Sequence, residues 1–106
     1  MTKMTGALSP EQALDRLLEM SADVRQGVIL DDRGRRLAGS RALAGPAREL
    51  LDAADAPEFE VATGRGAVFA VRSDGAAFVV VTQRSTLPAL MLYDLRVVLG
   101  EMAVRS

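Results

Sequence analysis

Hydrophobic positions follow a helical spacing at both ends of this chain and a strand-like spacing in its middle. Near the start, Leu14, Leu17 and Leu18 recur at helical intervals. They follow Ser9-Pro10-Glu11-Gln12, in which a capping serine, a proline at the first helical position and a glutamine three residues after the cap are typical of a helix start. A first helix is therefore predicted over residues 10–22.

A hairpin is predicted directly after this helix. The short apolar run Gly27–Leu30 is followed by Asp31-Asp32-Arg33-Gly34, a sequence typical of a turn in which Gly34 adopts positive φ. The chain then resumes as a second strand over Arg35–Ser40. Two strands separated by such a turn pair with each other in antiparallel fashion.

A second, short helix is predicted to open at Gly45-Pro46 and to end before Pro57. Between these positions Ala47, Leu50, Leu51 and Ala54 form one narrow apolar stripe. The expected length is about ten residues, from the distance between the two prolines.

Three strands in succession and a long final helix complete the predicted pattern. The strands are Glu58–Thr63, Ala67–Arg72 and Ala76–Gln83, separated by turns at Gly64-Arg65-Gly66 and Ser73-Asp74-Gly75. The last helix begins at Ser85-Thr86-Leu87-Pro88. Its core stripe is predicted to consist of Leu87, Met91, Leu95, Val98 and Met102.

These elements predict an α+β fold in which a five-stranded antiparallel sheet lies between helices, in the order α-β-β-α-β-β-β-α. Gly27–Leu30, Ala67–Arg72 and Ala76–Gln83 are apolar on both faces and are expected at the centre of the sheet, whereas Arg35–Ser40 and Glu58–Thr63 are expected at its edges. We expect a single domain over residues 9–106, preceded by a flexible N-terminal tail of residues 1–8.

The predicted helices cover the two faces of the sheet unequally. The first and last helices suffice for one face, but the short middle helix is alone on the other, and one helix about 10 Å wide covers only part of five strands spaced about 4.8 Å apart. Large exposed apolar areas usually mark an interface, and a bare edge strand offers unpaired backbone groups. We therefore predict a two-fold homodimer with these interface residues: Leu51, Ala54, Phe59, Val61 and Thr63.

Composition removes most catalytic chemistry. The chain has no cysteine and no histidine, and Lys3 is its only lysine. Disulfides, nucleophilic triads and Schiff-base chemistry are thereby excluded. We expect no catalytic, cofactor-binding or metal-binding residues, and hence no enzyme and no cofactor. The net charge of −1 and the lack of a long apolar run predict neither nucleic acid nor membrane as a partner, and a cytoplasmic location.

Several local patterns admit a functional and a structural interpretation. The carboxylates Asp31, Asp32 and Asp74 fit a metal or acid–base pair, but all lie in predicted turns, where aspartate is favoured locally. Gly64-Arg65-Gly66 is too short for a phosphate loop and lacks the lysine and following helix. The arginine cluster of residues 33, 35, 36 and 41 fits an acidic surface or a nucleotide phosphate, or simply a solvated hairpin.

The exposed side of the middle helix carries the most interesting surface. Arg48, Asp52 and Asp55 face away from its apolar stripe. If the middle helices of two subunits lie side by side, these residues line a shared platform, and we predict them as partner-binding residues. The alternative is an ordinary solvated helix face.

The run Gln26–Ala38, with its apolar strand, short Asp/Gly turn and second strand ending in small residues, resembles the opening hairpin of the roadblock / dynein light-chain family. The middle helix, the Arg65–Gln83 meander and the Leu87–Met102 helix follow in the family's order, so the resemblance spans Pro10 to Met102. It implies a roadblock/profilin-like fold and a homodimer with a ten-stranded sheet. For bacterial members it also implies regulatory or scaffold work with small Ras-like GTPases.

One alternative function is a small-molecule sensor domain built on a similar sheet with flanking helices. Such a domain needs an enclosed pocket with a few convergent polar groups. The predicted core is almost wholly aliphatic, which disfavours a polar ligand.

Overall fold

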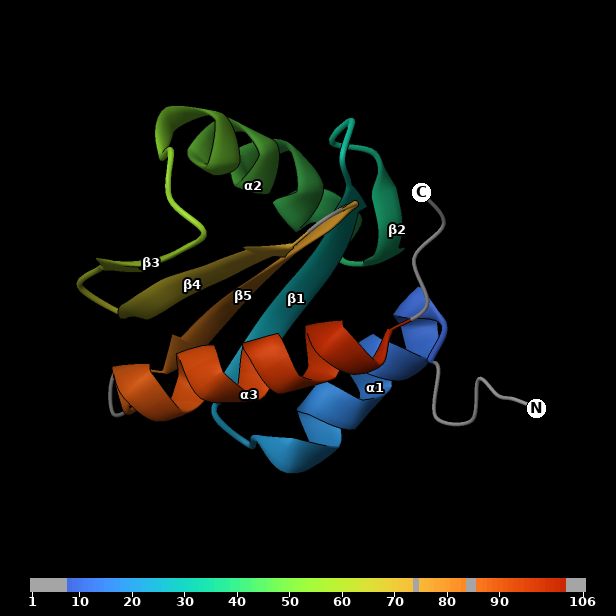
Figure 1. Cartoon of the computed structure of the whole chain (residues 1–106). Coiled ribbons are helices and arrows are strands. Elements are labelled where there is room, and N and C mark those ends of the chain that lie inside the picture. The colour runs from blue at the N-terminus through green and yellow to red at the C-terminus, as the bar shows by residue number, and fades with distance from the viewer. Residues whose placement is uncertain (1–7, 74, 84–85, 103–106) are drawn as a thin grey trace.

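The computed structural model describes residues 8–73, 75–83 and 86–102, and within them the chain forms three helices and five strands in the predicted order (Figure 1). The fold class is confirmed. The elements are α1 (Pro10–Met20), β1 (Val24–Asp31), β2 (Arg36–Gly39), α2 (Arg41–Ala53), β3 (Glu58–Ala62), β4 (Gly66–Ser73), β5 (Ala76–Gln83) and α3 (Pro88–Glu101).

All five strands belong to one antiparallel sheet with the order β2-β1-β5-β4-β3. The strands predicted to be central, β1, β4 and β5, occupy the three inner positions, and β2 and β3 form the edges. The assignment succeeds because a strand that is apolar on both faces needs cover on both faces.

Helices cover the two faces of this sheet unequally. Helices α1 and α3 lie together on one face and α2 lies alone on the other (Figure 1). The face beneath α1 and α3 contains both buried phenylalanines, Phe69 and Phe78, together with Leu17, Leu95 and Met91. The opposite core is smaller and includes these residues: Val28, Leu30, Ala44, Ala47, Leu51, Ala70, Ala77 and Val79.

Helix α1 begins as predicted. The Ser9 hydroxyl oxygen accepts a hydrogen bond from the Gln12 backbone N–H at 3.1 Å, and Gln12 Oε1 accepts one from the Ser9 N–H at 3.0 Å. This capping box satisfies donors that would otherwise have no partner within the first turn. The helix ends at Met20, two residues before the predicted end at residue 22.

The predicted start of α2 is wrong. The helix begins at Arg41, and Pro46 lies inside it. The Ser40 side chain accepts a hydrogen bond from the Leu43 N–H at 3.2 Å, and the helix that it caps begins five residues before Pro46. A proline inside a helix removes one backbone hydrogen bond. Here that loss is tolerated on the solvent side, because Pro46 is exposed. The helix is thus 13 residues long rather than about ten.

The hairpin turn is confirmed. Gly34 adopts a φ of 80°, and its N–H donates to the Asp31 carbonyl oxygen at 3.0 Å. Positive φ is strained for residues with a Cβ atom, so a glycine is expected at this position. The strand before the turn begins earlier than predicted, at Val24 rather than Gly27.

Some predictions fall outside the described residues, namely most of the N-terminal tail (residues 1–7), Asp74 in the β4–β5 turn and Ser85 before the last helix. Leu8, the last residue assigned to the tail, is described. Its N–H donates to the Glu101 carbonyl oxygen at 2.8 Å, so this residue lies against the end of α3.

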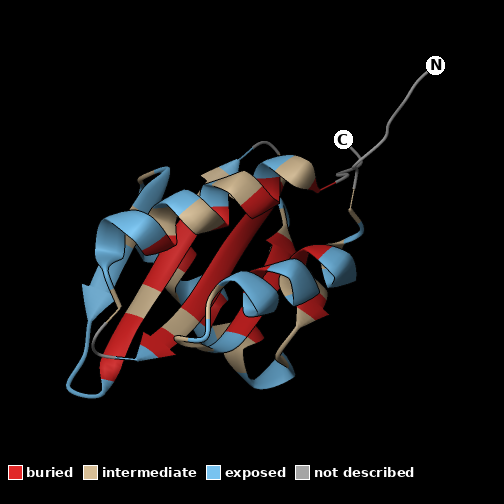
Figure 2. Cartoon of the chain, turned by 90° about the horizontal axis from the view of Figure 1, so that it is seen from below, coloured by how far each residue is buried: buried red, intermediate tan, exposed pale blue. Residues whose placement is uncertain are grey.

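Burial follows the sheet order (Figure 2). Strands β4 and β5 are mostly buried, β1 is buried over Gly27–Leu30, and four of the five residues of β3 are exposed. Met91 and Met102 belong to the core beneath α3, as predicted, and Tyr93 stands out from that stripe with 66% of its surface exposed. The assignment of Leu87 to the same stripe is wrong, because Leu87 precedes the first residue of α3 and is 66% exposed.

Candidate functional site

The α2 face of the sheet is covered only in part. Helix α2 packs mainly on β1. Farther across the same face, Val68 and Phe59 are half-buried and Val61 is 39% exposed. Val61 pairs with Val68, and Phe59 pairs with Ala70, so these side chains continue the apolar surface of the α2 core toward the β3 edge. An incompletely covered apolar surface therefore extends to a sheet edge.

The two edges of the sheet differ in how they are protected. Strand β2 is only four residues long, lies beneath α1, and the Arg36 guanidinium donates to the Gly39 carbonyl oxygen at 3.1 Å. Short edge strands and covered carbonyls discourage pairing with another chain. Within the described residues, β3 has a strand neighbour on one side only. Of the two edges, β3 is the more open to a further strand.

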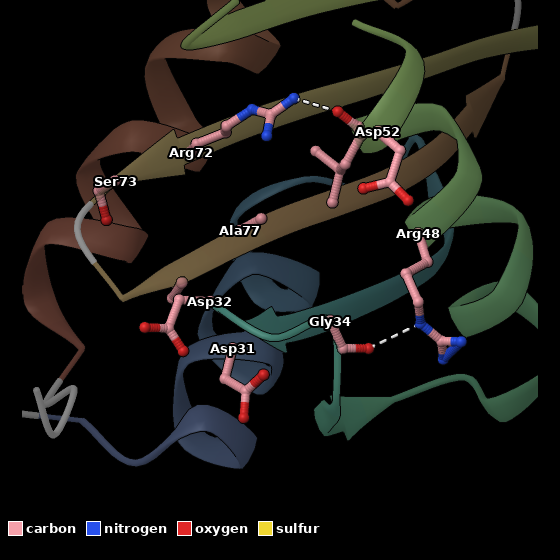
Figure 3. A pocket seen from close by; sticks show the side chains of 10 residues that line it. Asp31, Asp32, Gly34, Arg48, Asp52, Arg72, Ser73 and Ala77 are labelled. Atoms are coloured by element: carbon pink, nitrogen blue, oxygen red, sulfur yellow. Dashed lines mark hydrogen bonds between the residues drawn. The ribbon is translucent and has the colours of Figure 1, made fainter. Parts of the chain in front are cut away.

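A polar hollow lies at the end of the sheet between the β1–β2 hairpin, α2 and the β4–β5 turn (Figure 3). Its volume is about 220 Å³. The lining combines charged and small side chains, and includes Asp31, Asp32, Arg48, Asp52, Arg72 and Ala77. The hollow thus gathers carboxylates and guanidinium groups from elements that are distant in the sequence.

Both arginines of the hollow are engaged with backbone carbonyls. Arg72 donates to the carbonyl oxygens of Leu51, Ala54 and Ala56, the last at 3.1 Å, and so satisfies carbonyls at and just after the end of α2. Figure 3 shows one of these bonds. The Arg48 Nε donates to the Gly34 carbonyl oxygen at 2.8 Å, which ties α2 to the hairpin turn. These guanidinium contacts attach the end of α2 to β4 and its middle to the hairpin turn.

Asp31 is likewise committed to its own turn. One carboxylate oxygen accepts the backbone N–H groups of Arg33 and Arg35, both at 2.9 Å, and the other accepts the Arg35 Nε at 3.0 Å. The Arg35 N–H is the main cause that lowers the pKa of Asp31 below its usual value; partial desolvation opposes it, and the Arg33 N–H and the Arg35 side chain add to the lowering. The structural interpretation of Asp31 as a turn residue is therefore confirmed.

The structure brings two of the three predicted partner-binding residues together. Arg48 and Asp52, one helical turn apart, both line the hollow. Asp55 lies beyond the end of α2 at Ala53 and is exposed away from that lining. Arg72 and Asp32 also line the hollow, and this was not predicted from the sequence, because their neighbours there come from other elements.

The five predicted interface residues occupy different environments. Leu51 is only 9% exposed and belongs to the subunit's own core, and Ala54 is the C-cap of α2. Phe59 and Val61 lie on the incompletely covered face of β3. Thr63 follows β3, and its hydroxyl oxygen accepts the N–H groups of Arg65 and Gly66 at 3.3 and 3.0 Å.

The two hydrogen bonds of the Thr63 hydroxyl also explain the conformation of the Gly64-Arg65-Gly66 segment. Its amides after Gly64 are used within the turn, so they do not form a free phosphate cradle. In the arginine cluster, Arg35 is paired with Asp31 and Arg36 with the Gly39 carbonyl. No group of three or more acidic side chains that could hold a metal ion occurs in the part of the chain that the structure describes.

Comparisons with known proteins find similarity in structure and not in sequence. No protein-family model matches the chain, and no curated protein matches its sequence. A crystal structure of a Roadblock/LC7 domain from Streptomyces avermitilis superposes with a TM-score of 0.72 at 21% identity, covering 86% of this chain and 95% of that one. This chain has the Roadblock/LC7 fold.

A second Roadblock/LC7 domain structure from the same organism gives a TM-score of 0.66 at 14% identity, covering 81% of this chain and 88% of the other. The resemblance of the hairpin and of the element order to this family is therefore confirmed at the level of the fold. In the described part of this Roadblock/LC7 fold, no helix is long and apolar enough to cross a membrane.

Proposed function

We propose that this chain is a non-enzymatic regulatory or scaffold module that forms a homodimer and binds a small Ras-like GTPase or a similar signalling protein. The observation that carries the proposal is the apolar surface of the α2 face, which continues through Val68 to the exposed Val61 on the β3 edge. The Roadblock/LC7 fold supports the same assignment.

The proposed dimer joins two β3 strands around a two-fold axis. Such an arrangement gives each β3 a second hydrogen-bonding neighbour and lets Phe59 and Val61 pack against their counterparts. It also places the two α2 helices on the same side of one continuous sheet. The interface would thus protect the part of the α2 face that a single helix leaves uncovered.

The proposed partner surface is the solvent side of the paired α2 helices. Asp52 is exposed there beside Arg48, whose Nε is bound to the Gly34 carbonyl, so this surface presents one carboxylate and one guanidinium. Charged groups of this kind fix the register of a protein partner and steer its approach.

A small-molecule sensor has less support. The hollow beside α2 measures about 220 Å³, below the range of about 300–1,000 Å³ in which most ligand pockets fall. Its two arginines already bind backbone carbonyls of the protein itself. A thermal-shift screen with nucleotides and metabolites tests this alternative, and a clear stabilisation by one compound would favour it.

The dimer is tested with Val61→Lys. Because Val61 is 39% exposed in one subunit, we expect the variant to fold, while lysine at the proposed seam places two like charges in an apolar contact. Light scattering should report twice the chain mass of 11.3 kDa for the wild type and 11.3 kDa for the variant. Leu18→Lys, at a side chain 44% exposed on α1, should remain dimeric. A monomeric wild type at micromolar concentration would contradict the dimer.

The GTPase partner is tested by titrating the dimer with purified small Ras-like GTPases of the same organism, each loaded with GDP or a GTP analogue. We expect one of them to bind, with a preference for one nucleotide state, and Asp52→Lys to weaken that binding about tenfold or more. Glu11→Lys on α1 is the matched control, because it changes charge on the opposite face of the sheet. A dimer that binds none of these proteins would overturn the GTPase assignment and leave the dimer intact.

A further inference from the structure

Helix α3 is apolar on more sides than its place on the sheet requires. Its inner stripe, which includes Met91, Leu95 and Val98, is buried against the sheet. A second apolar stripe, at i, i+3 and i+10, consists of Leu87, Leu90 and Val97 and lies beside the first. Leu87 is 66% exposed and Leu90 is 56% exposed. A helix with one packed face is expected to be polar elsewhere, so a second apolar stripe indicates a second contact.

This second stripe borders a groove. The groove lies between the end of α1 and the first half of α3 and has a volume of about 190 Å³. Its lining includes Ser21, Asp23, Leu87, Leu90, Met91 and Asp94. Nearer the other end of α3, the Arg16 guanidinium and the Glu101 carboxylate join the two helices through an ion pair of 2.8 Å. The groove thus lies near the start of α3, and the ion pair lies near its end.

The charges that line the groove have one sign. Asp23 and Asp94 line it, both are half-buried, and among the described residues neither forms an ion pair. A carboxylate that is partly removed from water gains most from a cation brought to it. An apolar floor flanked by two unpaired carboxylates is complementary to a segment that presents aliphatic side chains beside a basic one.

We propose that the α1–α3 groove binds an amphipathic helix of a partner protein, with aliphatic side chains seated on Leu87 and Leu90 and an arginine or lysine between Asp23 and Asp94. Helices bind other proteins in this way when residues at i, i+3, i+4 and i+7 form one apolar face. The groove lies on the face of the sheet opposite α2 (Figure 1). It is therefore a surface separate from the proposed dimer seam and GTPase platform, and a module with both surfaces would connect two partners.

Two synthetic helical peptides provide the test. Both carry the same leucine face; one has arginines flanking it and the other has glutamates at the same positions. Fluorescence anisotropy gives the affinity, and amide chemical shifts locate the contact. We expect the arginine peptide to bind at least about tenfold more tightly, and to shift the amides of Ser21, Asp23, Leu90 and Asp94. Its affinity should fall with added salt.

Variants at the groove sharpen the test. Leu90→Asp places a carboxylate on the apolar floor and should weaken the arginine peptide about tenfold or more. Asp94→Asn keeps the shape, and it should reduce both the affinity and its salt dependence. Leu18→Asp is the matched control. Leu18 lies one turn after Leu14, and the Leu14 side chain packs over Gly27 of β1. Leu18 is therefore on the side of α1 away from Arg16, which contacts α3. This variant should bind the peptide as the wild type does.

Three results would overturn the proposal. The first is equal affinity for the two peptides, because the carboxylates would then have no role in recognition. The second is a shift pattern on α2 and β3 without the groove residues. The third is a wild-type chain whose self-association is abolished by Leu90→Asp, which would identify the occupant as a second copy of this chain. Because Leu90 is more than half exposed, thermal unfolding should show that the variant is folded.

Discussion

The two faces of the sheet are held to their helices by different interactions. Beneath α1 and α3 the contact is made by large apolar side chains, with Phe78 and Leu95 fully buried. On the other face, the buried residues of α2 are Ala44, Ala47 and Leu51, and the two alanines allow a close approach but bury little area. That helix is fixed in addition by Arg72 and Arg48, which bind backbone carbonyls at its end and in the hairpin. The comparison indicates that α1 and α3 cover their face of the sheet within a single subunit. Helix α2 is held partly by polar contacts, and it leaves apolar side chains near the β3 edge, such as Val61, uncovered.

The largest expected effect is on the free energy of unfolding, and it is measured by substituting two neighbouring residues that face opposite sides of the sheet. Phe78 and Val79 are consecutive on β5, and both are fully buried. Phe78→Ala should lower the free energy of unfolding by about 3–5 kcal/mol, because it leaves a large cavity beneath α3. Val79→Ala removes less volume and should cost about 2 kcal/mol. Chemical denaturation measures both.

An equal cost for the two substitutions would contradict the comparison, because the smaller volume removed at Val79 would then cost as much as the larger volume removed at Phe78. The dimer adds a further distinction. If the α2 face borders the subunit contact, the loss caused by Val79→Ala should vary with protein concentration more than the loss caused by Phe78→Ala.

The next largest effect concerns the polar attachment of α2. Arg72→Met keeps the length of the side chain but leaves the carbonyls of Leu51, Ala54 and Ala56 without their donor. We expect a loss of about 2–3 kcal/mol in the free energy of unfolding. Hydrogen exchange should accelerate in the last turn of α2 and remain unchanged in α1. Arg65→Met, in an exposed turn, should change stability by less than about 0.5 kcal/mol.

The sequence predicted most of the fold because its strongest signals are local. Ser9 and Gln12 define the start of α1 within four residues, and strands that are apolar on both faces are separated from strands with polar residues, which distinguishes central from edge strands. The start of α2 was missed because two local rules compete there. A proline favours the first helical position, but Ser40 provides a better cap farther upstream, and Pro46 is accommodated on the exposed side.

The candidate site was predicted less well, because its contacts join distant parts of the chain. Arg72 was assigned only to a strand, and its carbonyl partners lie 16 to 21 residues earlier. Backbone carbonyls leave no signature in the sequence, so this role of Arg72 could not be inferred from composition or spacing. Asp52 and Arg48 were identified because they share one side of a helix, whereas Asp32 joins them only through the tertiary fold.

The smallest expected effect is a pH dependence confined to the α2 side of the molecule. The pKa of Asp31 is lowered mainly by the Arg35 backbone N–H, so the folded protein prefers the ionised carboxylate. The stabilisation is therefore fully present above the unfolded pKa of about 3.9 and is lost as the pH falls through the lower, folded value. Because the hairpin binds Arg48 through the Gly34 carbonyl, we expect acid to loosen the contact between the hairpin and α2 before it affects α1 or α3.

Asp31→Asn isolates this contribution. The difference in unfolding free energy between wild type and variant should be constant near neutral pH and should shrink as the pH falls below about 4. A gap between wild type and Asp31→Asn that widens in acid would reverse the sign argued here. It would mean that the carboxylate is a burden in the folded hairpin, and that the α2 side is held by its arginine contacts alone.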